Sequence, residues 1–271
     1  MLISLLLALA IDRYFTRPKT AFIDFYFART AGLLSKGLSG PASKHWLRAA
    51  IMILPLLIIS GGLFIADSSL LSWIAQTVLL TLCIGSVMLR RNVECFESAL
   101  ARGDEEAAGR YLDGMSQDTY RVASQNDLAC SLLWINYRYY VAVVLITAIL
   151  GIPGLIIYCS ARWLQLNVPG EHQRSVPEEF IRIIDIIGVR LTGLTYLLVG
   201  HFSRAATPWV KNLFTVAPSP RLFLTRVGQQ AGEFEVGQAK ASASSAAVLA
   251  KRSLGCLVVI IAVLTLAGVL H

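Results

Sequence analysis

Apolar residues gather in six stretches along the chain, with polar segments between them. Four of these stretches are long enough for membrane-spanning helices, since about 20 mostly apolar residues cross ~30 Å of hydrocarbon. A fifth, Phe180–Gly200, is apolar but contains Asp185 and Arg190. The sixth, Met1–Ile11, predicts a short first helix that continues to Tyr14. The four long stretches are Leu47–Ala66, Leu70–Leu89, Val141–Tyr158 and Leu254–Leu270.

The first stretch has two alternative interpretations. Ala8-Leu9-Ala10 has the small-residue spacing of a signal-peptide cleavage site. No basic residue precedes the apolar run, however, so we expect a retained helix. A shallow or tilted insertion is the alternative to a full crossing.

Together the stretches predict an all-α, polytopic membrane protein with about five or six transmembrane helices in a single membrane domain. The predicted spans lie near residues 1–14, 47–66, 70–89, 141–158, 180–200 and 254–270. Gly151-Ile152-Pro153-Gly154 predicts a break or kink, because proline lacks an N–H and clashes with the preceding turn. The pattern leaves open whether Val141–Tyr158 crosses the membrane or re-enters.

Basic residues set the expected orientation, since cytoplasmic loops carry an excess of lysine and arginine. Asp12–Arg48 contains seven basic and two acidic residues, and so does Arg204–Arg252. We expect both segments in the cytoplasm, together with Arg90–Arg138. Both termini then lie outside, Cys159–Glu179 forms an outer loop, and residues 90–138 and 204–252 form cytoplasmic helical insertions.

The local structure of three polar segments can also be predicted. Thr20–Leu38 has a helical apolar stripe, which predicts an amphipathic helix either on the inner leaflet or packed on the bundle. Asp104 follows Gly103 and is the expected N-cap of a new helix. Gly237–Ala250 is rich in small residues and predicts a flexible tether or a weak helix that leads into the last span.

Composition narrows the function classes. Of the 271 residues, 55% are hydrophobic and 15% are charged, which excludes disorder and a nucleic-acid-binding arm. The net charge of +7 therefore favours an anionic membrane surface as its partner rather than nucleic acid. The five cysteines and four histidines are scattered without metal-ligand spacing, so we predict neither a metal site nor a cofactor.

The strongest candidate for chemistry is a stripe of polar and small residues in the fifth stretch. A charged group within a span costs at least ~2.5–3.5 kcal/mol, so it must face a cavity or a partner. Arg190 lies beside the stripe. Arg182 and Asp185 are three residues apart and can pair on one helix face. The pattern therefore predicts either a structural ion pair or a ligand or relay role. The stripe consists of Arg182, Asp185, Gly188, Thr192 and Tyr196, which recur at intervals of three and four residues.

A second polar cluster, Trp134–Tyr140, stands directly before Val141. One interpretation is an aromatic and basic anchor at the membrane interface. The other is an anion site, because the guanidinium of Arg138 makes forked contacts with phosphate or carboxylate. Asn136 and Tyr140 are four residues apart and would share its face. Asp12 and Arg13 form a third candidate, although such a pair often only marks a helix boundary.

Three long strings of the chain are distinctive: LLWINYRYYVAVVL, IIDIIGVRLTGLTYLLVGH and AKRSLGCLVVIIAVLTLAGVL. They resemble segments of the AmpE family of bacterial inner-membrane proteins. Their order and spacing are similar along nearly the whole chain, and the first hundred residues are the weakest part. The resemblance implies a part in β-lactamase induction and peptidoglycan-recycling signalling.

A more distant resemblance is to the membrane cobinamide-phosphate synthases, which form an amide link in cobalamin assembly. GIPGLIIY, IDIIGVRLTGL and Leu9–Arg13 are similar to segments of that family, and Ser116-Gln117-Asp118-Thr119 is similar to its S-R-D-T motif. The resemblance makes Asp118 and Thr119 secondary site candidates. Gln117 replaces the arginine, and Trp134–Tyr140 replaces a Glu-Asn-rich stretch. The fold and a pocket are therefore expected to persist without amide synthesis.

These observations favour a multi-pass inner-membrane regulatory or sensory protein. Its partners would be the lipid bilayer, an anionic small-molecule ligand and a protein of the same signalling pathway, and a homo-oligomer is compatible with the sequence. The alternatives are a membrane-embedded enzyme related to the synthases and a small-molecule transporter. The expected pocket consists of Asn136, Arg138, Tyr140, Arg182, Asp185, Arg190, Thr192 and Tyr196.

Overall fold

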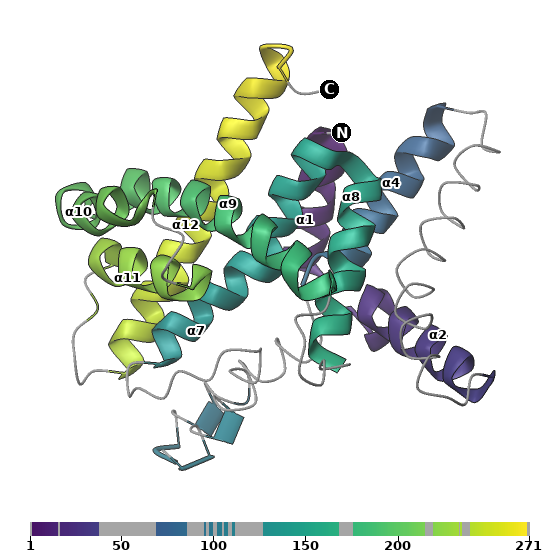
Figure 1. Cartoon of the computed structure of the whole chain (residues 1–271), viewed down its shortest axis with the longest axis horizontal. Coiled ribbons are helices and arrows are strands. Elements are labelled where there is room, and N and C mark those ends of the chain that lie inside the picture. Colours follow the sequence, from purple (N-terminus) through teal and green to yellow (C-terminus); the bar gives the residue numbers. More distant parts are fainter. Residues whose placement is uncertain are drawn as a thin grey trace. The chain divides into compact units, whose positions relative to one another are not determined.

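The computed structural model describes residues 2–15, 17–37, 69–85, 95, 98–99, 102–104, 106–107, 110–111, 127–167, 176–214, 219–232, 234 and 239–269. Every regular element in these ranges is helical, which confirms the predicted all-α class (Figure 1). The chain divides into two compact units. Unit 1 comprises Met1–Val87, Val143–Ile181 and Gly268–His271, and unit 2 comprises Met88–Ala142 and Arg182–Ala267.

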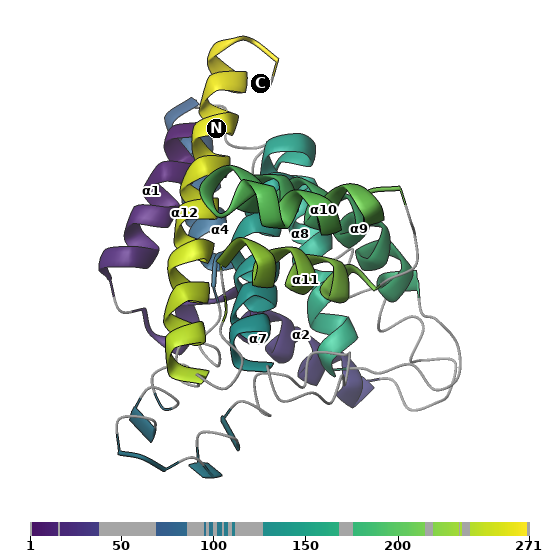
Figure 2. The ribbon, with the colours of Figure 1, turned by 90° about the vertical axis from the view of Figure 1, so that its left-hand side faces the viewer.

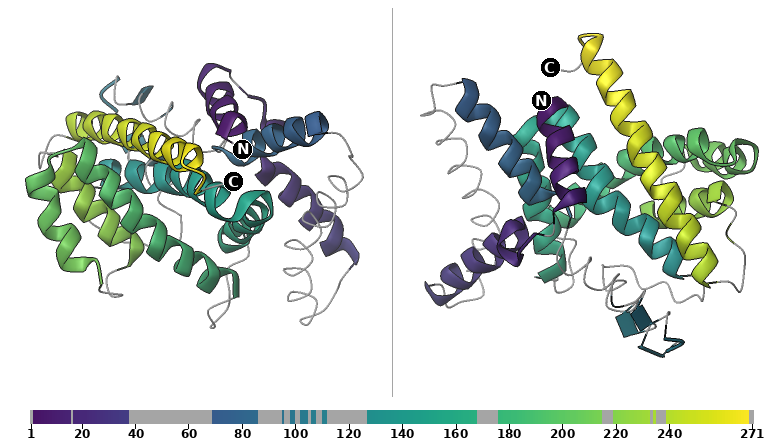
Figure 3. Two further views of the ribbon diagram at one scale, coloured as in Figure 1. Left: turned by 90° about the horizontal axis from the view of Figure 1, so that it is seen from above. Right: turned by 180° about the vertical axis from the view of Figure 1, so that it is seen from behind.

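Unit 1 contains the N-terminal helices. Helices α1 and α4 pack side by side (Figure 3). Buried Asp12 on α1 binds Arg17, and Arg17 also donates to the backbone carbonyls of Thr81 and Ile84 at the end of α4. Because helix-terminal carbonyls carry partial negative charge, a cation is stabilised there. The helices are α1 (Leu2–Tyr14), the 3₁₀ turn η1 (Lys19–Ala21), α2 (Ile23–Gly37), α4 (Ser69–Cys83) and α8 (Ala142–Asn167) from Val143 onward.

Unit 2 contains the remaining helices and the polar cluster. Helix α12 packs along α7, and α10 packs on α11 (Figure 2). Gly228 of α11 stands so close to α7 that a Cβ there would lie 2.3 Å from Cδ1 of Leu133. The elements are α7 (Asp127–Asn136), the π-helical turn η2 (Tyr137–Val141), α9 (Val176–Val199) from Arg182 onward, α10 (Phe202–Asn212), α11 (Pro220–Gly232) and α12 (Ala239–Leu266).

Helix α8 is kinked at Gly151, which confirms the prediction from the Gly-Ile-Pro-Gly sequence. Gly151 has φ +67° and ψ −163°, a conformation that costs residues with a side chain more than glycine. Two residues later, Pro153 supplies no backbone N–H to the helix. The helix resumes after the kink and continues to Asn167.

The ends of several predicted stretches are corrected. Within the stretch 70–89, α4 ends at Cys83 and Gly85 follows it with φ +78°, and residues 86–89 lie outside the described residues. The helix of the stretch 141–158 continues to Asn167, so the first nine residues of the expected outer loop, from Cys159, are helical. Residues 239–250 of the small-residue segment are helical and continuous with the last apolar stretch in α12, as the helix alternative to a tether predicts. Leu47–Ala66 lies outside the described residues.

Two smaller predictions are confirmed. The carboxylate of Asp104 accepts a hydrogen bond of 2.9 Å from the backbone N–H of Ala107, as an N-cap does. Most of the segment 20–38 forms α2, and its residues Ile23 and Phe27 are 6% and 1% exposed. The ring of Phe27 lies 6.3 Å from that of Trp163 on α8, so this face packs within unit 1.

Two helical stretches in the described ranges, Ala129–Gln165 and Ser244–Leu266, are long and apolar enough to cross a membrane. Trp73–Cys83 is a shorter apolar helix. Only 28% of the apolar window in Ser244–Leu266 is buried, so most of that surface is available to lipid.

Substitution of two helical glycines by alanine tests the packing of unit 2. Gly228→Ala should lower the free energy of unfolding by about 1–3 kcal/mol, because the methyl group would overlap Leu133. Gly255→Ala is the matched control, since nothing lies within 4 Å of a Cβ there. Alanine should raise helix stability at Gly255 by about 0.5–1 kcal/mol. Reversible unfolding of the purified chain in mixed micelles measures both, and equal effects would contradict the assigned contact.

Candidate functional site

Helix α9 presents its polar side chains inward and its large apolar side chains outward. Asp185, Thr192 and Tyr196 are 3%, 0% and 0% exposed. A helix in water would show the opposite arrangement, whereas a helix in lipid must hide its polar groups. The buried face therefore matches the predicted polar stripe. The exposed face consists of Ile183, Ile187, Leu191, Leu194 and Leu198.

The centre of this inward face is an ion pair between Asp185 and Arg138. Nη2 of Arg138 lies 3.2 Å from Oδ2 of Asp185, and the side chains are 1% and 4% exposed. The hydroxyl of Tyr137 donates to the other carboxylate oxygen, Oδ1, at 3.0 Å. Both oxygens of one buried carboxylate are thus held by consecutive residues of η2, which offsets part of the desolvation cost of the charges.

The π-helical turn η2 supplies both partners of Asp185. Its widened hydrogen bond runs from the backbone N–H of Ala142 to the carbonyl of Tyr137, five residues apart. π-helical turns inside α-helices are rare and frequently lie at functional sites. The turn therefore identifies the Tyr137–Asp185 region as the leading candidate site.

Aromatic rings surround the guanidinium. The guanidinium carbon of Arg138 lies 5.1 Å from the ring centroid of Trp134, a cation–π distance. The rings of Trp134 and Tyr137 have centroids 5.4 Å apart. Gly188 faces this group, and a Cβ there would lie 2.3 Å from the hydroxyl oxygen of Tyr137. The small residue of the stripe is thus required for the hydroxyl to reach Asp185.

Three buried polar atoms near this cluster or on the same helix face have no hydrogen-bond partner among the described residues. They are Nε1 of Trp134, Oδ1 of Asn136 and the hydroxyl oxygen of Tyr196. Buried polar groups are normally paired, so each such atom calls for a bound partner such as water or a ligand. The indole N–H and the phenol O–H are donors, which suits a negatively charged partner.

The side chain of Arg190 contacts residues that lie outside α9, elsewhere in unit 2. Its Nε donates to the carbonyl of Leu213 at 2.6 Å and its Nη1 to the carbonyl of Ile186 at 2.6 Å. The guanidinium lies 5.4 Å from the ring centroid of Phe223, and the indole N–H of Trp209 donates to the carbonyl of Arg190. These contacts tie α9 to α10 and α11.

The other predicted residues have simpler surroundings. Tyr140 in η2 and Arg182 near the start of the inward face are half-buried. The hydroxyl of Thr192 donates to the carbonyl of Gly188 on its own helix. Asp12 binds Arg17 in unit 1, and Arg13 is exposed. Asp118 and Thr119 lie outside the described residues.

Sequence reasoning missed Arg162, which was expected in an outer loop. Its side chain is fully buried in unit 1, 3.8 Å from the carboxylate of Asp24 and 5.8 Å from the ring centroid of Tyr158. The helical spacing of Tyr158, Arg162 and Gln165, at four and three residues, is the signal that could have placed it on one buried face. No three histidine, cysteine or carboxylate side chains of the described residues gather as a metal site.

Comparison of the sequence with known proteins shows which proteins the chain is similar to, independently of the structure. The family described as "Regulatory signalling modulator protein AmpE" matches residues 1–271. Protein AmpE of Shigella flexneri is 30% identical over 224 residues, which cover 77% of this chain and 78% of that protein. Cobalamin biosynthesis protein CobD of Stutzerimonas stutzeri is 25% identical over 221 residues, covering 76% and 72% respectively. CobD of Chromobacterium violaceum is 27% identical over 181 residues, covering 59% and 54%. No solved structure matches the chain.

Removal of one member of the ion pair should destabilise the protein more than removal of both. Asp185→Asn leaves the buried Arg138 charge uncompensated and should cost about 3–5 kcal/mol of unfolding free energy. The double variant Arg138→Met, Asp185→Leu removes both charges and should cost less. Asp104→Asn, at an exposed N-cap where asparagine serves equally well, is the control with no expected change. A double variant that loses as much unfolding free energy as Arg138→Met and Asp185→Leu lose separately, added together, would contradict the pairing.

Proposed function

Because the chain belongs to the AmpE family, we propose that it is a multi-pass inner-membrane regulatory protein that takes part in β-lactamase induction. It responds to an anionic molecule derived from the cell wall during peptidoglycan recycling. The Arg138–Asp185 pair is the recognition element. The observation that supports the proposal is a buried ion pair between the π-helical turn η2 and α9 within an apolar helical unit.

Membrane embedding is supported by the distribution of exposed apolar side chains. Ile187 on α9 is 57% exposed, and Val259 and Leu266 on α12 are 62% and 84% exposed. In water such surfaces are costly, and in a bilayer they are the surfaces that contact acyl chains. The proposed topology has both termini outside and six crossings, the short first helix included, with residues 90–138 and 204–252 on the cytoplasmic side.

Anion recognition is supported by the donors around Arg138. A guanidinium presents a planar fork of N–H groups that matches carboxylate and phosphate. In the structure Asp185 occupies part of this fork, so an anionic ligand competes with Asp185 for the same donors. The ligand then compensates the charge of Arg138, and the displaced Asp185 must take up a proton or reach water, which frees α9 from η2. A protein partner in the same signalling pathway then senses the altered helix position.

A second candidate function is synthesis of an amide within the membrane, which the similarity to two CobD proteins favours. The altered residues of Trp134–Tyr140 and Gln117 weigh against it. Turnover by the purified chain with Mg²⁺, ATP and a candidate amine and acid would establish this candidate in place of the first.

Induction in living cells tests the regulatory proposal. The chain and its variants replace the resident AmpE homologue in a strain whose β-lactamase induction depends on it. Loss of a charge-assisted hydrogen bond costs about 1.5–3 kcal/mol, so Arg138→Gln should require about tenfold more inducer or more. Arg138→Lys, which keeps the charge without the fork, should fall between wild type and Arg138→Gln.

The control is Arg226→Gln, at an exposed arginine on α11. It should leave the inducer dose response unchanged. Membrane levels of each variant, measured by immunoblot, separate loss of recognition from loss of protein. If Arg138→Gln responds as wild type does at equal membrane levels, the recognition element is not Arg138.

A further inference from the structure

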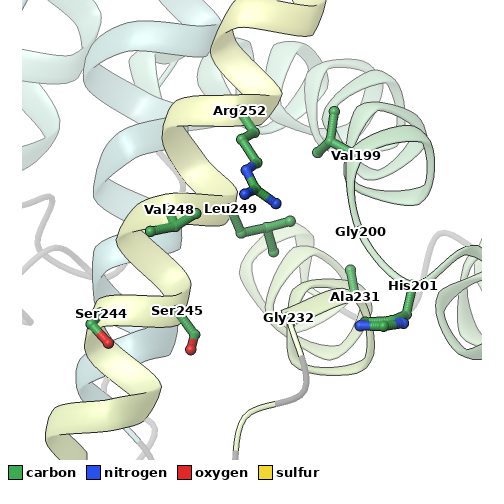
Figure 4. Close-up of a pocket in the computed structure, with 10 residues that line it drawn as sticks. All are labelled: Val199, Gly200, His201, Ala231, Gly232, Ser244, Ser245, Val248, Leu249 and Arg252. Atoms are coloured by element: carbon green, nitrogen blue, oxygen red, sulfur yellow. The ribbon is translucent and has the colours of Figure 1, made fainter.

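Unit 2 contains a cavity that none of the residues around the Arg138–Asp185 pair lines. It has a volume of about 460 Å³, within the size range of small-molecule sites. The ends of α9 and α11 border it on one side, and the N-terminal half of α12 borders it on the other (Figure 4). From its lining we propose that this cavity binds a phosphate group that carries an organic substituent.

Backbone contacts fix the wall formed by α9 and α11. The N–H of His201 donates to the carbonyl of Ala231 at 3.0 Å. A Cβ at Gly200 would lie 2.6 Å from that carbonyl oxygen and 2.9 Å from Cβ of Ala231. Only glycine permits this approach of the two chain segments, so the wall is built into the fold.

Basic and hydroxyl groups enter the cavity from two elements. The guanidinium of Arg252 descends from α12, with the hydroxyls of Ser244 and Ser245 on the turns before it, and the imidazole of His201 borders the opposite side (Figure 4). None of the described residues that line the cavity carries a carboxylate. No described residue forms a salt bridge with Arg252, so its charge is available to a ligand.

The donor groups of this lining favour a phosphate ligand. A guanidinium binds two phosphate oxygens through parallel N–H donors, and hydroxyl and imidazole groups are further donors of the kind that bind phosphate oxygens. Val199, Val248 and Leu249 supply an apolar wall. Apolar side chains do not stabilise an inorganic ion, so the ligand carries a carbon-containing group beside its phosphate.

Two sources provide such a group. Arg252 stands within the apolar stretch Ser244–Leu266, whose later part exposes Val259 and Val263. A phospholipid would place its headgroup in the cavity and its acyl chains along this surface. A water-soluble phosphate monoester would occupy the cavity from the aqueous side. Both present the same anion to the same residues.

Binding to the full-length chain in neutral detergent tests the proposal with two probes. Native mass spectrometry measures retention of phosphatidic acid, and isothermal titration calorimetry measures binding of glycerol 3-phosphate. Arg252→Gln should weaken whichever probe binds at least about tenfold, as expected for loss of a charge-assisted contact. Lys251→Gln, the adjacent exposed residue that does not line the cavity, should change binding less than twofold.

Each outcome decides the proposal. Loss of phosphatidic acid alone in Arg252→Gln supports a lipid headgroup, and loss of glycerol 3-phosphate supports a soluble ester. Ser245→Trp, which fills the cavity without changing charge, should reduce binding in parallel. The proposal is overturned if wild type binds neither probe, or if Arg252→Gln and Lys251→Gln weaken binding equally, because that result describes general charge attraction.

Discussion

The Arg138–Asp185 ion pair constrains the arrangement of unit 2. A charge in an apolar medium is tolerated only when a partner of opposite charge and further hydrogen bonds accompany it. Asp185 therefore fixes the rotation of α9, because its side chain must point at η2. Once that rotation is set, position 188 must be glycine to leave room for the Tyr137 side chain, and the isoleucines on the opposite face must point outward.

The sequence alone predicted the polar stripe of α9 and the break at Gly151. Both depend on local signals, namely side-chain spacing along one helix and the backbone preferences of glycine and proline. It also singled out Arg138 and Asp185 individually. Their pairing could not be derived, since the two residues are 47 positions apart and several other partners, including Arg182, satisfied the same spacing rules.

Other features lacked any local signal. Arg162 was placed in a loop because hydropathy falls after Tyr158, yet Asp24, far away in the chain, makes its burial tolerable. The π-helical geometry of Tyr137–Val141 has no distinctive composition. The cavity at Arg252 is formed by the ends of separate helices, two of them contributing glycine, so its lining residues come together only in three dimensions.

The widened turn at η2 also affects how the helix can move. An α-helix advances about 100° per residue, and a π-helical turn adds one residue to the loop closed by each hydrogen bond. If the extra residue moved one position along the chain, the side chain at that position would rotate by about 100° around the helix axis. Both flanking helices would stay folded. Tyr137 and Arg138 sit at such a position, so the contacts of Asp185 can be exchanged by a change of helical register rather than by unfolding.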